Sequence, residues 1–176
     1  MFSDANKTPP RELLECIVDW ITADHCLCSE SVRLVRIRSN FTCPLGGLVR
    51  WCILGPIVTI DVDESKSQEK GSSVVKKDTK QEQSLSSSSL MTIFSKLHLG
   101  VLLSLQAYRS MELNEQLFSY GDIYIVSKTL ATYYKGGQCT EQVKDVVSVA
   151  VDRLAQTIQM ALATRALSGY HFIMTY

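Results

Sequence analysis

The chain has 176 residues, of which 45% are apolar and 20% are charged, and its eighteen basic side chains balance eighteen acidic ones. This size and composition predict one globular domain, and the neutral total excludes a global field that would attract nucleic acid or an acidic membrane surface. The composition therefore favours protein partners.

The N-terminal residues carry neither the basic nor the apolar region of a secretory signal. The longest apolar run, residues 45–60, contains Arg50 and a Gly55-Pro56 pair and is too short to span a bilayer. We expect an intracellular protein with no membrane partner, in which the six cysteines are reduced thiols.

The N-terminal part predicts an amphipathic helix. Thr8 followed by Pro9 and Pro10 is a helix-start signal, with Thr8 as the N-cap, and the helix is expected to end near Ala23. Trp20 lies on the flank of its apolar face. That face consists of Leu13, Leu14, Ile17, Val18 and Ile21.

Residues 31–38 fit either a short strand, because apolar residues and arginines partly alternate, or a helix. A helix is favoured because a lone strand would have no partner in this sequence. Pro44 is then expected to open a further helix, which Gly55-Pro56 should end. Arg50 falls opposite its apolar stripe and Trp51 falls beside it. The stripe consists of Leu45, Leu48, Val49, Cys52 and Ile53.

Residues 61–89 change composition abruptly. They contain nine serines, eleven charged residues and no aromatic residue. Four apolar side chains are too few to offset the entropy of ordering such a backbone. We expect a disordered serine- and lysine-rich loop inserted between helices.

After this loop, Ser89 is expected to cap a central helix that is apolar on two faces. Gly100 in its middle costs about 1 kcal/mol relative to alanine, which indicates close helix packing. The main face consists of Leu90, Ile93, Phe94, Leu97, Val101, Leu105 and Tyr108, and Leu99 and Leu103 lie opposite.

Two more helices are predicted, one over residues 114–135 and one from Thr140 to Gly169. The expected buried stripe of the first consists of Leu117, Tyr120, Tyr124, Ser127, Ala131 and Tyr134. That of the second consists of Val143, Val146, Val147, Ala150, Leu154, Ile158, Ala161 and Leu162.

These elements predict an all-α fold of five or six helices in a single domain over residues 1–176. There is no clean internal period, so a strict tetratricopeptide or ankyrin repeat is not supported. Irregular antiparallel helix pairs stacked like HEAT or armadillo units are compatible with the pattern.

No motif supports an enzyme or a cofactor site. His25, His98 and His171 are far apart and lack a nucleophile or acid partner, and His98 fits a structural role on the edge of a buried face. His25, Cys26, Cys28 and Cys43 form one Cys-x-Cys pair without a second, so loop and core thiols are favoured over a metal site.

Four arginines border the loop region: Arg33, Arg36, Arg38 and Arg50. They could form a basic patch that contacts RNA or DNA, which is the alternative function for this chain. A solvated helix face is favoured because the total charge is neutral, so we expect no direct nucleic-acid contact.

Four ordered blocks of sequence resemble the Integrator complex subunit 15 family. They are PPRELLECIVDWI at 9–21, PLGGLVRWC at 44–52, SKLHLGVL at 95–102 and DRLAQTIQMA at 152–161. Single blocks would be weak evidence, whereas the ordered set with a polar linker between the second and third is specific.

The resemblance implies a non-catalytic, all-helical scaffold subunit of the nuclear Integrator assembly, which cleaves RNA polymerase II transcripts including small nuclear RNA precursors. It implies partners in the module of subunits 10, 13 and 14. Family members are longer, with a helical region before the first block and a proline-rich tail after the last, so we expect a divergent or N-terminally incomplete member. Trp20, Arg50 and Trp51 are the predicted partner-binding residues. Tryptophans on the flank of a helix face are favoured interface anchors, and core packing is the alternative for both.

Overall fold

The computed structural model describes residues 10–38, 44–68, 79–108, 119–135 and 141–167. Side chains at 32–38, 44, 61–68, 79–88 and 142 are outside that description. Within the described ranges the chain forms six helices and no strand, which confirms the all-α prediction. They are α1 (Arg11–Ala23), α2 (His25–Arg38), α3 (Pro44–Gln68), α4 (Thr79–Ala107), α5 (Tyr120–Lys135) and α6 (Glu141–Ala163).

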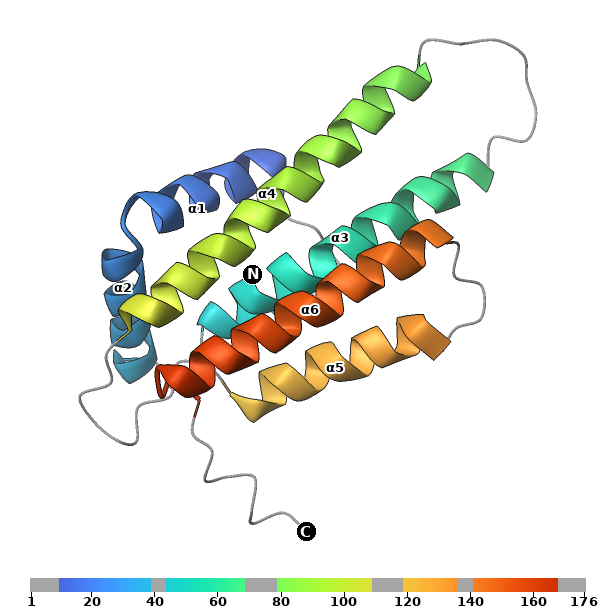
Figure 1. Cartoon of the computed structure of the whole chain (residues 1–176). Coiled ribbons are helices and arrows are strands. Elements are labelled where there is room, and N and C mark those ends of the chain that lie inside the picture. Colours follow the sequence, from blue (N-terminus) through green and yellow to red (C-terminus); the bar gives the residue numbers. More distant parts are fainter. Residues whose placement is uncertain (1–9, 39–43, 69–78, 109–118, 136–140, 168–176) are drawn as a thin grey trace.

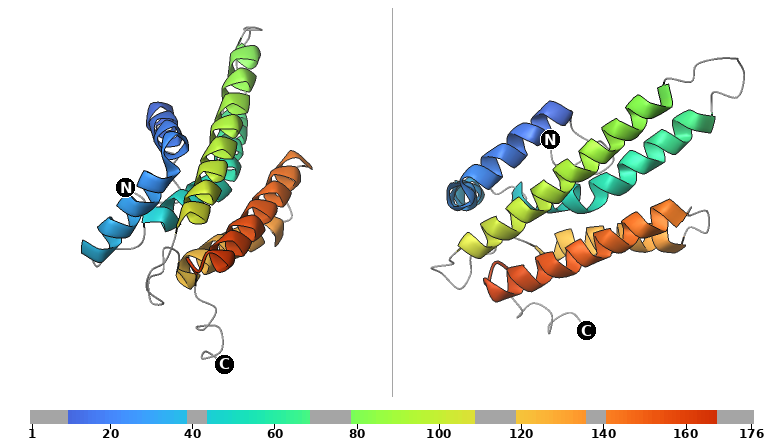
Figure 2. Two further views of the ribbon diagram at one scale, coloured as in Figure 1. Left: turned by 60° about the vertical axis from the view of Figure 1, so that its left-hand side comes forward. Right: turned by 45° about the horizontal axis from the view of Figure 1, so that its top comes forward.

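The helices form two layers (Figure 1 and Figure 2). The long helices α3 and α4 lie antiparallel, and α1 and α2 pack against α4. The antiparallel pair α5 and α6 forms the second layer, with α6 in contact with both α3 and α4. The central position expected for the helix that contains Gly100 is therefore confirmed. Stacking of the HEAT type remains a prediction.

The predicted face of α1 is confirmed, since Leu14, Val18 and Ile21 are buried. The helix ends at Ala23 as expected, because the Asp24 side chain accepts a hydrogen bond from the Leu27 amide and begins α2. Residues 31–38 are helical as favoured. The predicted cap Thr8 lies outside the described residues.

The predicted stripe of α3 is buried, but the helix does not end at Gly55-Pro56. Proline removes the N–H that would bond the carbonyl four residues earlier, which here is Cys52. Arg153 of α6 replaces that donor, with its Nη1 2.8 Å from the Cys52 oxygen. The helix continues past Pro56 to Gln68 because a tertiary contact satisfies the freed carbonyl.

The loop expected over 61–89 is helical at both ends, over 61–68 in α3 and over 79–89 in α4. Helix α4 therefore starts at Thr79 instead of after a cap at Ser89. Extending an existing helix costs far less than nucleating one, and Lys80–Gln83 are straight-chain residues of good helix propensity. The middle of the expected loop, residues 69–78, lies outside the described residues.

Two glycines of this layer permit close approach of helices, as expected for Gly100. A Cβ atom at Gly100 would lie 2.5 Å from Cγ2 of Ile21 in α1. A Cβ atom at Gly55 would lie 2.5 Å from the Phe94 ring in α4. Helix α4 thus packs against α1 and α3 at distances that only a glycine allows.

The stripe predicted for α5 is wrong from Tyr124 onward, whereas Tyr120 at the start of the helix is partly buried against the core. Tyr124 is 65% exposed and Tyr134 is 78% exposed, and Ser127 and Ala131 are also exposed. The buried face consists of Asp122, Val126 and Leu130 instead. The error arises because Asp122, an acidic residue, occupies a core position with a buried partner. Leu117 lies outside the described residues.

The predicted face of α6 is largely confirmed, with Val143, Val147, Ala150, Leu154 and Ala161 buried. Leu162 is exposed, contrary to expectation. The helix ends at Ala163, before the predicted Gly169, and the positive φ of 61° at Arg165 turns the chain. Thr140 and Gly169 lie outside the described residues.

Among the described helices, the stretch Ser89–Ala107 is long and apolar enough to cross a bilayer by length and composition. It is part of α4, which contacts α1, α2, α3 and α6. A helix surrounded by others in a protein core has the same apolar composition.

Candidate functional site

The structure places the three predicted partner-binding residues differently. Trp20 on α1 is 41% exposed and is accessible to another protein. Trp51 is 5% exposed and belongs to the core cluster, as the packing alternative anticipates. Arg50 is largely buried in an ion pair with Asp122, so the three residues do not form one surface.

The pair of Arg50 and Asp122 joins α3 to α5. Arg50 Nη2 donates to Asp122 Oδ1, and the side chains are 16% and 6% exposed. Ser119 donates to the other carboxylate oxygen and accepts from the Asp122 amide at 3.1 Å, which caps α5. Gly46 makes room for the carboxylate, since a Cβ atom there would lie 2.6 Å from Asp122 Cγ.

This ion pair also bears on the predicted basic patch. The charge of Arg50 is balanced by that of Asp122 inside the protein, so Arg50 does not add to a basic patch on the surface. The side chains of Arg33, Arg36 and Arg38 lie outside the description, although their backbone belongs to α2. No observation on the described residues favours nucleic-acid binding.

Two of the four cysteines in the described ranges are buried, and among the described residues no group of three His, Cys, Asp or Glu side chains could hold a metal ion. Burial raises the pKa of the Cys52 thiol to about 12, so this side chain is protonated at neutral pH. Burial also raises the pKa of the Cys28 thiol. Cys26 is exposed near the start of α2, and Cys43 lies outside the described residues.

His98 and Arg153 form a polar network between α4 and α6. Arg153 Nη1 donates to the Cys52 carbonyl, and Nη2 donates to Ser95 Oγ at 2.7 Å. His98 Nε2 lies 3.2 Å from the Arg153 carbonyl oxygen and 3.3 Å from Thr157 Oγ1. Because a carbonyl can only accept, Nε2 carries the proton. His98 is therefore a satisfied structural histidine, as the sequence suggests.

We predict that His98 makes the folded state sensitive to acid. Burial, together with the positive charge of Arg153, lowers the pKa of His98 from its ordinary value of 6.5. As pH falls below 6.5, the unfolded chain takes up a proton on this imidazole that the folded chain does not, so stability is lost. Urea denaturation across this range should show the loss in the wild type.

The comparison for this measurement is His98→Gln, which keeps an N–H donor but cannot titrate. Carboxylates contribute equally to both proteins, so the difference in unfolding free energy isolates the imidazole. The wild type should lose stability relative to the variant on acidification. Parallel curves would contradict this assignment of the histidine.

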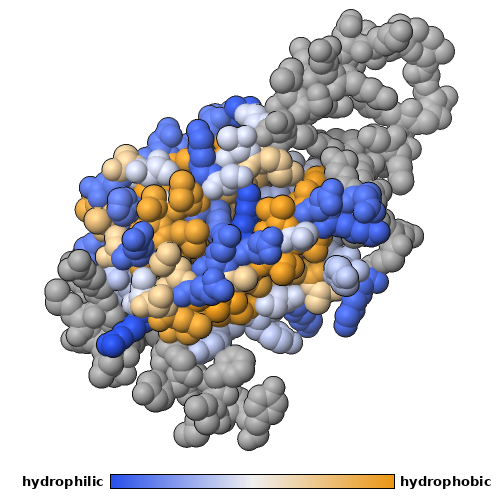
Figure 3. Space-filling view, in the orientation of Figure 1, coloured by the Kyte–Doolittle hydropathy of each residue, from blue (hydrophilic) through white to orange (hydrophobic). Residues whose placement is uncertain are grey.

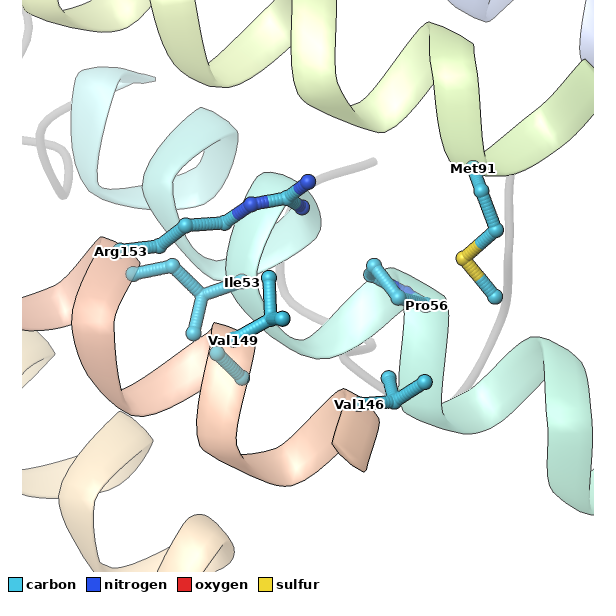
Figure 4. A pocket seen from close by; sticks show the side chains of 7 residues that line it. Ile53, Pro56, Met91, Val146, Val149 and Arg153 are labelled. Atoms are coloured by element: carbon cyan, nitrogen blue, oxygen red, sulfur yellow. The ribbon is translucent and has the colours of Figure 1, made fainter. Parts of the chain in front are cut away.

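An apolar groove lies beside the same network (Figure 4). It encloses about 200 Å³ and is partly open to solvent. Helix α3 forms its floor. One wall is formed by α4 at Met91, and the other is formed by α6. The lining residues are Ile53, Pro56, Met91, Val146, Val149, Ala150 and Arg153. Arg153 is the only charged residue among them.

Apolar side chains also reach the surface elsewhere. Figure 3 shows apolar surface interrupted by hydrophilic side chains on the face formed by α4 and α6. Exposed large apolar residues occur on α1, α2, α4, α5 and α6; they are Trp20, Leu27, Leu99, Tyr124, Ile125, Tyr134, Val149, Val151 and Leu162. Exposed apolar side chains that are scattered singly over a surface are common in monomeric proteins, so they do not by themselves define a site.

Comparison with known proteins relates the chain to one family. The family model of Integrator complex subunit 15 matches residues 1–175. The chain belongs to the Integrator complex subunit 15 family. A relative from Danio rerio with that name is 32% identical over 94% of this chain, and the Mus musculus and Homo sapiens proteins are 28% and 26% identical over 90% of it.

The chain spans 35–37% of the length of these curated members of the Integrator complex subunit 15 family. No solved structure matches it.

Sequence reasoning missed two structural residues, Asp122 and Arg153. Asp122 is spaced four and eight residues from Val126 and Leu130, a sign that it shares their buried face. Pro56 in an otherwise helical pattern indicated that some donor must serve the Cys52 carbonyl. Neither signal identifies the partner, because Arg50 and Asp122 are 72 positions apart and Arg153 and Cys52 are 101 apart.

Proposed function

We propose that the chain is a non-catalytic helical scaffold unit of the nuclear Integrator complex. It binds other subunits, in particular the module of subunits 10, 13 and 14, and supports small nuclear RNA 3′-end processing and cleavage of RNA polymerase II transcripts through these contacts. The observation that carries the proposal is the match of the Integrator complex subunit 15 model to residues 1–175.

The described surface supports a role in protein contacts. Large apolar side chains are exposed on five of the six helices, and the net charge of the chain is zero. Arg50 and Trp51 are engaged inside the protein, so the proposal of a specific contact residue is confined to Trp20. Exposed tryptophans supply large contact areas at low entropic cost.

The chemistry of the described side chains supports a non-catalytic role. The buried thiols have raised pKa values, and the Nε2–H of His98 donates a hydrogen bond to the Arg153 carbonyl of α6. A catalytic nucleophile or base needs the opposite, namely a reactive protonation state and access to substrate. Scaffold contacts use none of these groups.

Affinity purification of the tagged chain from nuclear extract tests the proposed function. Integrator subunits should be recovered with the chain and not with the tag alone, and quantitative mass spectrometry reads out their amounts. Recovery of subunits 10, 13 and 14 above the rest would support the module. Recovery of no Integrator subunit would refute the scaffold role.

Trp20→Ala is expected to reduce this recovery, because truncation of a tryptophan that is an interface hot spot costs about 2 kcal/mol or more, roughly thirtyfold in affinity. Leu99→Ala is the matched control, since Leu99 is also exposed but on α4. Both variants should keep the helical circular dichroism of the wild type. Equal recovery with both would remove Trp20 from the interface.

A further inference from the structure

The groove between α4 and α6 has the size of a site for a single side chain. A closed cavity of about 150 Å³ holds one benzene ring, so a partly open groove of about 200 Å³ has room for one aromatic or large aliphatic side chain. Its walls supply Met91, Val146 and Val149, and Val149 is 49% exposed at the rim. An apolar side chain that entered would exchange water for apolar walls.

Arg153 gives the groove a charge preference. Its guanidinium has five N–H donors, and two of them are used, by the neutral oxygens of Cys52 and Ser95. No carboxylate in the described part of the chain pairs with it. A partly buried guanidinium without a counter-ion is complementary to a carboxylate, which it can bind with two hydrogen bonds.

We propose that this groove is a docking site for a segment of another Integrator subunit, which inserts one aromatic or large aliphatic side chain and places an aspartate or glutamate against Arg153. The apolar side chain of the segment would contact the apolar walls of the groove. The nearby carboxylate would pair with the guanidinium of Arg153. This inference rests on the proposed function for the identity of the partner, but not for the chemistry of the groove.

The first test uses Val149→Asp in the affinity purification described above. The new carboxylate lies four residues before Arg153 on α6, so it blocks the rim and supplies an internal partner for the guanidinium. Val151→Asp is a matched control, since Val151 is also a valine of α6 and is likewise 49% exposed, but it does not line the groove. Recovery of Integrator subunits should fall by about tenfold or more with Val149→Asp and remain with Val151→Asp.

Equal recovery with the two variants would overturn the docking proposal while leaving the scaffold function standing. If the wild type recovers no Integrator subunit, the scaffold function fails and the partner named here fails with it. Whether the groove binds an apolar group next to a carboxylate is then tested by a second measurement that needs no other Integrator subunit.

The second test titrates 3-phenylpropionate into the isotope-labelled full chain and follows the methyl groups of Val146, Val149 and Ala150 by NMR. Saturable shifts should appear at these methyls, and the neutral 3-phenylpropionamide should bind several-fold more weakly because it lacks the charge that Arg153 recognises. Val149→Asp should abolish the shifts. No shifts at the groove, or equal binding of acid and amide, would overturn the proposal.

Two other occupants are distinguishable by NMR titration and by sedimentation. If Phe172→Ser in the full chain strengthens binding of 3-phenylpropionate, the C-terminal segment of the chain fills the groove, and the proposed partner is wrong. If the wild type sediments as a dimer that Val149→Asp converts to a monomer, the occupant is a second copy of the chain, and the proposal is again overturned.

Discussion

Asp122→Ala is expected to lower the free energy of unfolding by about 3–5 kcal/mol, because it leaves the Arg50 guanidinium buried without its counter-ion. The substitution also removes the carboxylate that accepts a hydrogen bond from the Ser119 hydroxyl at the start of α5. Since a domain of this size is stable by about 5–15 kcal/mol, the loss should be a large part of the total. Urea denaturation followed by circular dichroism measures it.

Two variants make this result specific to the ion pair. Asp152→Ala removes an exposed carboxylate on α6 and should change stability by less than about 0.5 kcal/mol. Arg50→Met combined with Asp122→Leu replaces both charges by apolar groups and should recover much of the loss. A change below about 1 kcal/mol for Asp122→Ala, or no recovery in the double variant, would show that the pair does not hold α5 against α3.

Phe94→Ala is expected to cost about 3–5 kcal/mol, as truncation of a buried phenylalanine removes its transfer free energy and leaves a cavity. The ring is fully buried in α4 and fills the space that Gly55 leaves on α3. Arg153 of α6 donates to the Cys52 carbonyl of α3 and to Ser95 Oγ of α4, so both helices are also held by α6 and do not collapse freely into that space. The loss should appear in the same denaturation experiment.

Leu99→Ala is the control for Phe94→Ala. Leu99 belongs to the same helix but is 54% exposed, so its truncation should cost less than about 0.5 kcal/mol. If the two substitutions cost the same, the face of α4 assigned to the core is incorrect. If Phe94→Ala costs less than about 1 kcal/mol, the contact between α3 and α4 is looser than the geometry indicates.

The faces that could be predicted from sequence are those defined by local spacing. Leu14, Val18 and Ile21 repeat at intervals of three and four, and they are buried as expected. Gly100 indicated close helix packing, and the side chain of Ile21 in α1 lies against it where a Cβ atom would be. These features depend only on the helical period and on the size of single side chains.

The features that could not be predicted depend on partners distant in sequence. The rule that proline ends a helix predicts a helix end at Pro56. Helix α3 continues instead, and Arg153 from α6 donates a hydrogen bond to the Cys52 carbonyl that the proline leaves free. Local spacing also predicts that Tyr124 and Tyr134 of α5 are buried. The pairing of Asp122 with Arg50 instead places the face of Asp122 inward and leaves these two tyrosines exposed. The groove beside Arg153 was missed for the same reason, because three separate helices line it.

The most direct test of the central claim is size-exclusion chromatography of the purified full chain mixed with recombinant Integrator subunits 10, 13 and 14. If the chain is a scaffold unit that binds this module, it should co-elute with the module at low micromolar concentration, and Val149→Asp should weaken that co-elution while Val151→Asp should not. Separate elution of the folded wild-type chain at that concentration would contradict the account.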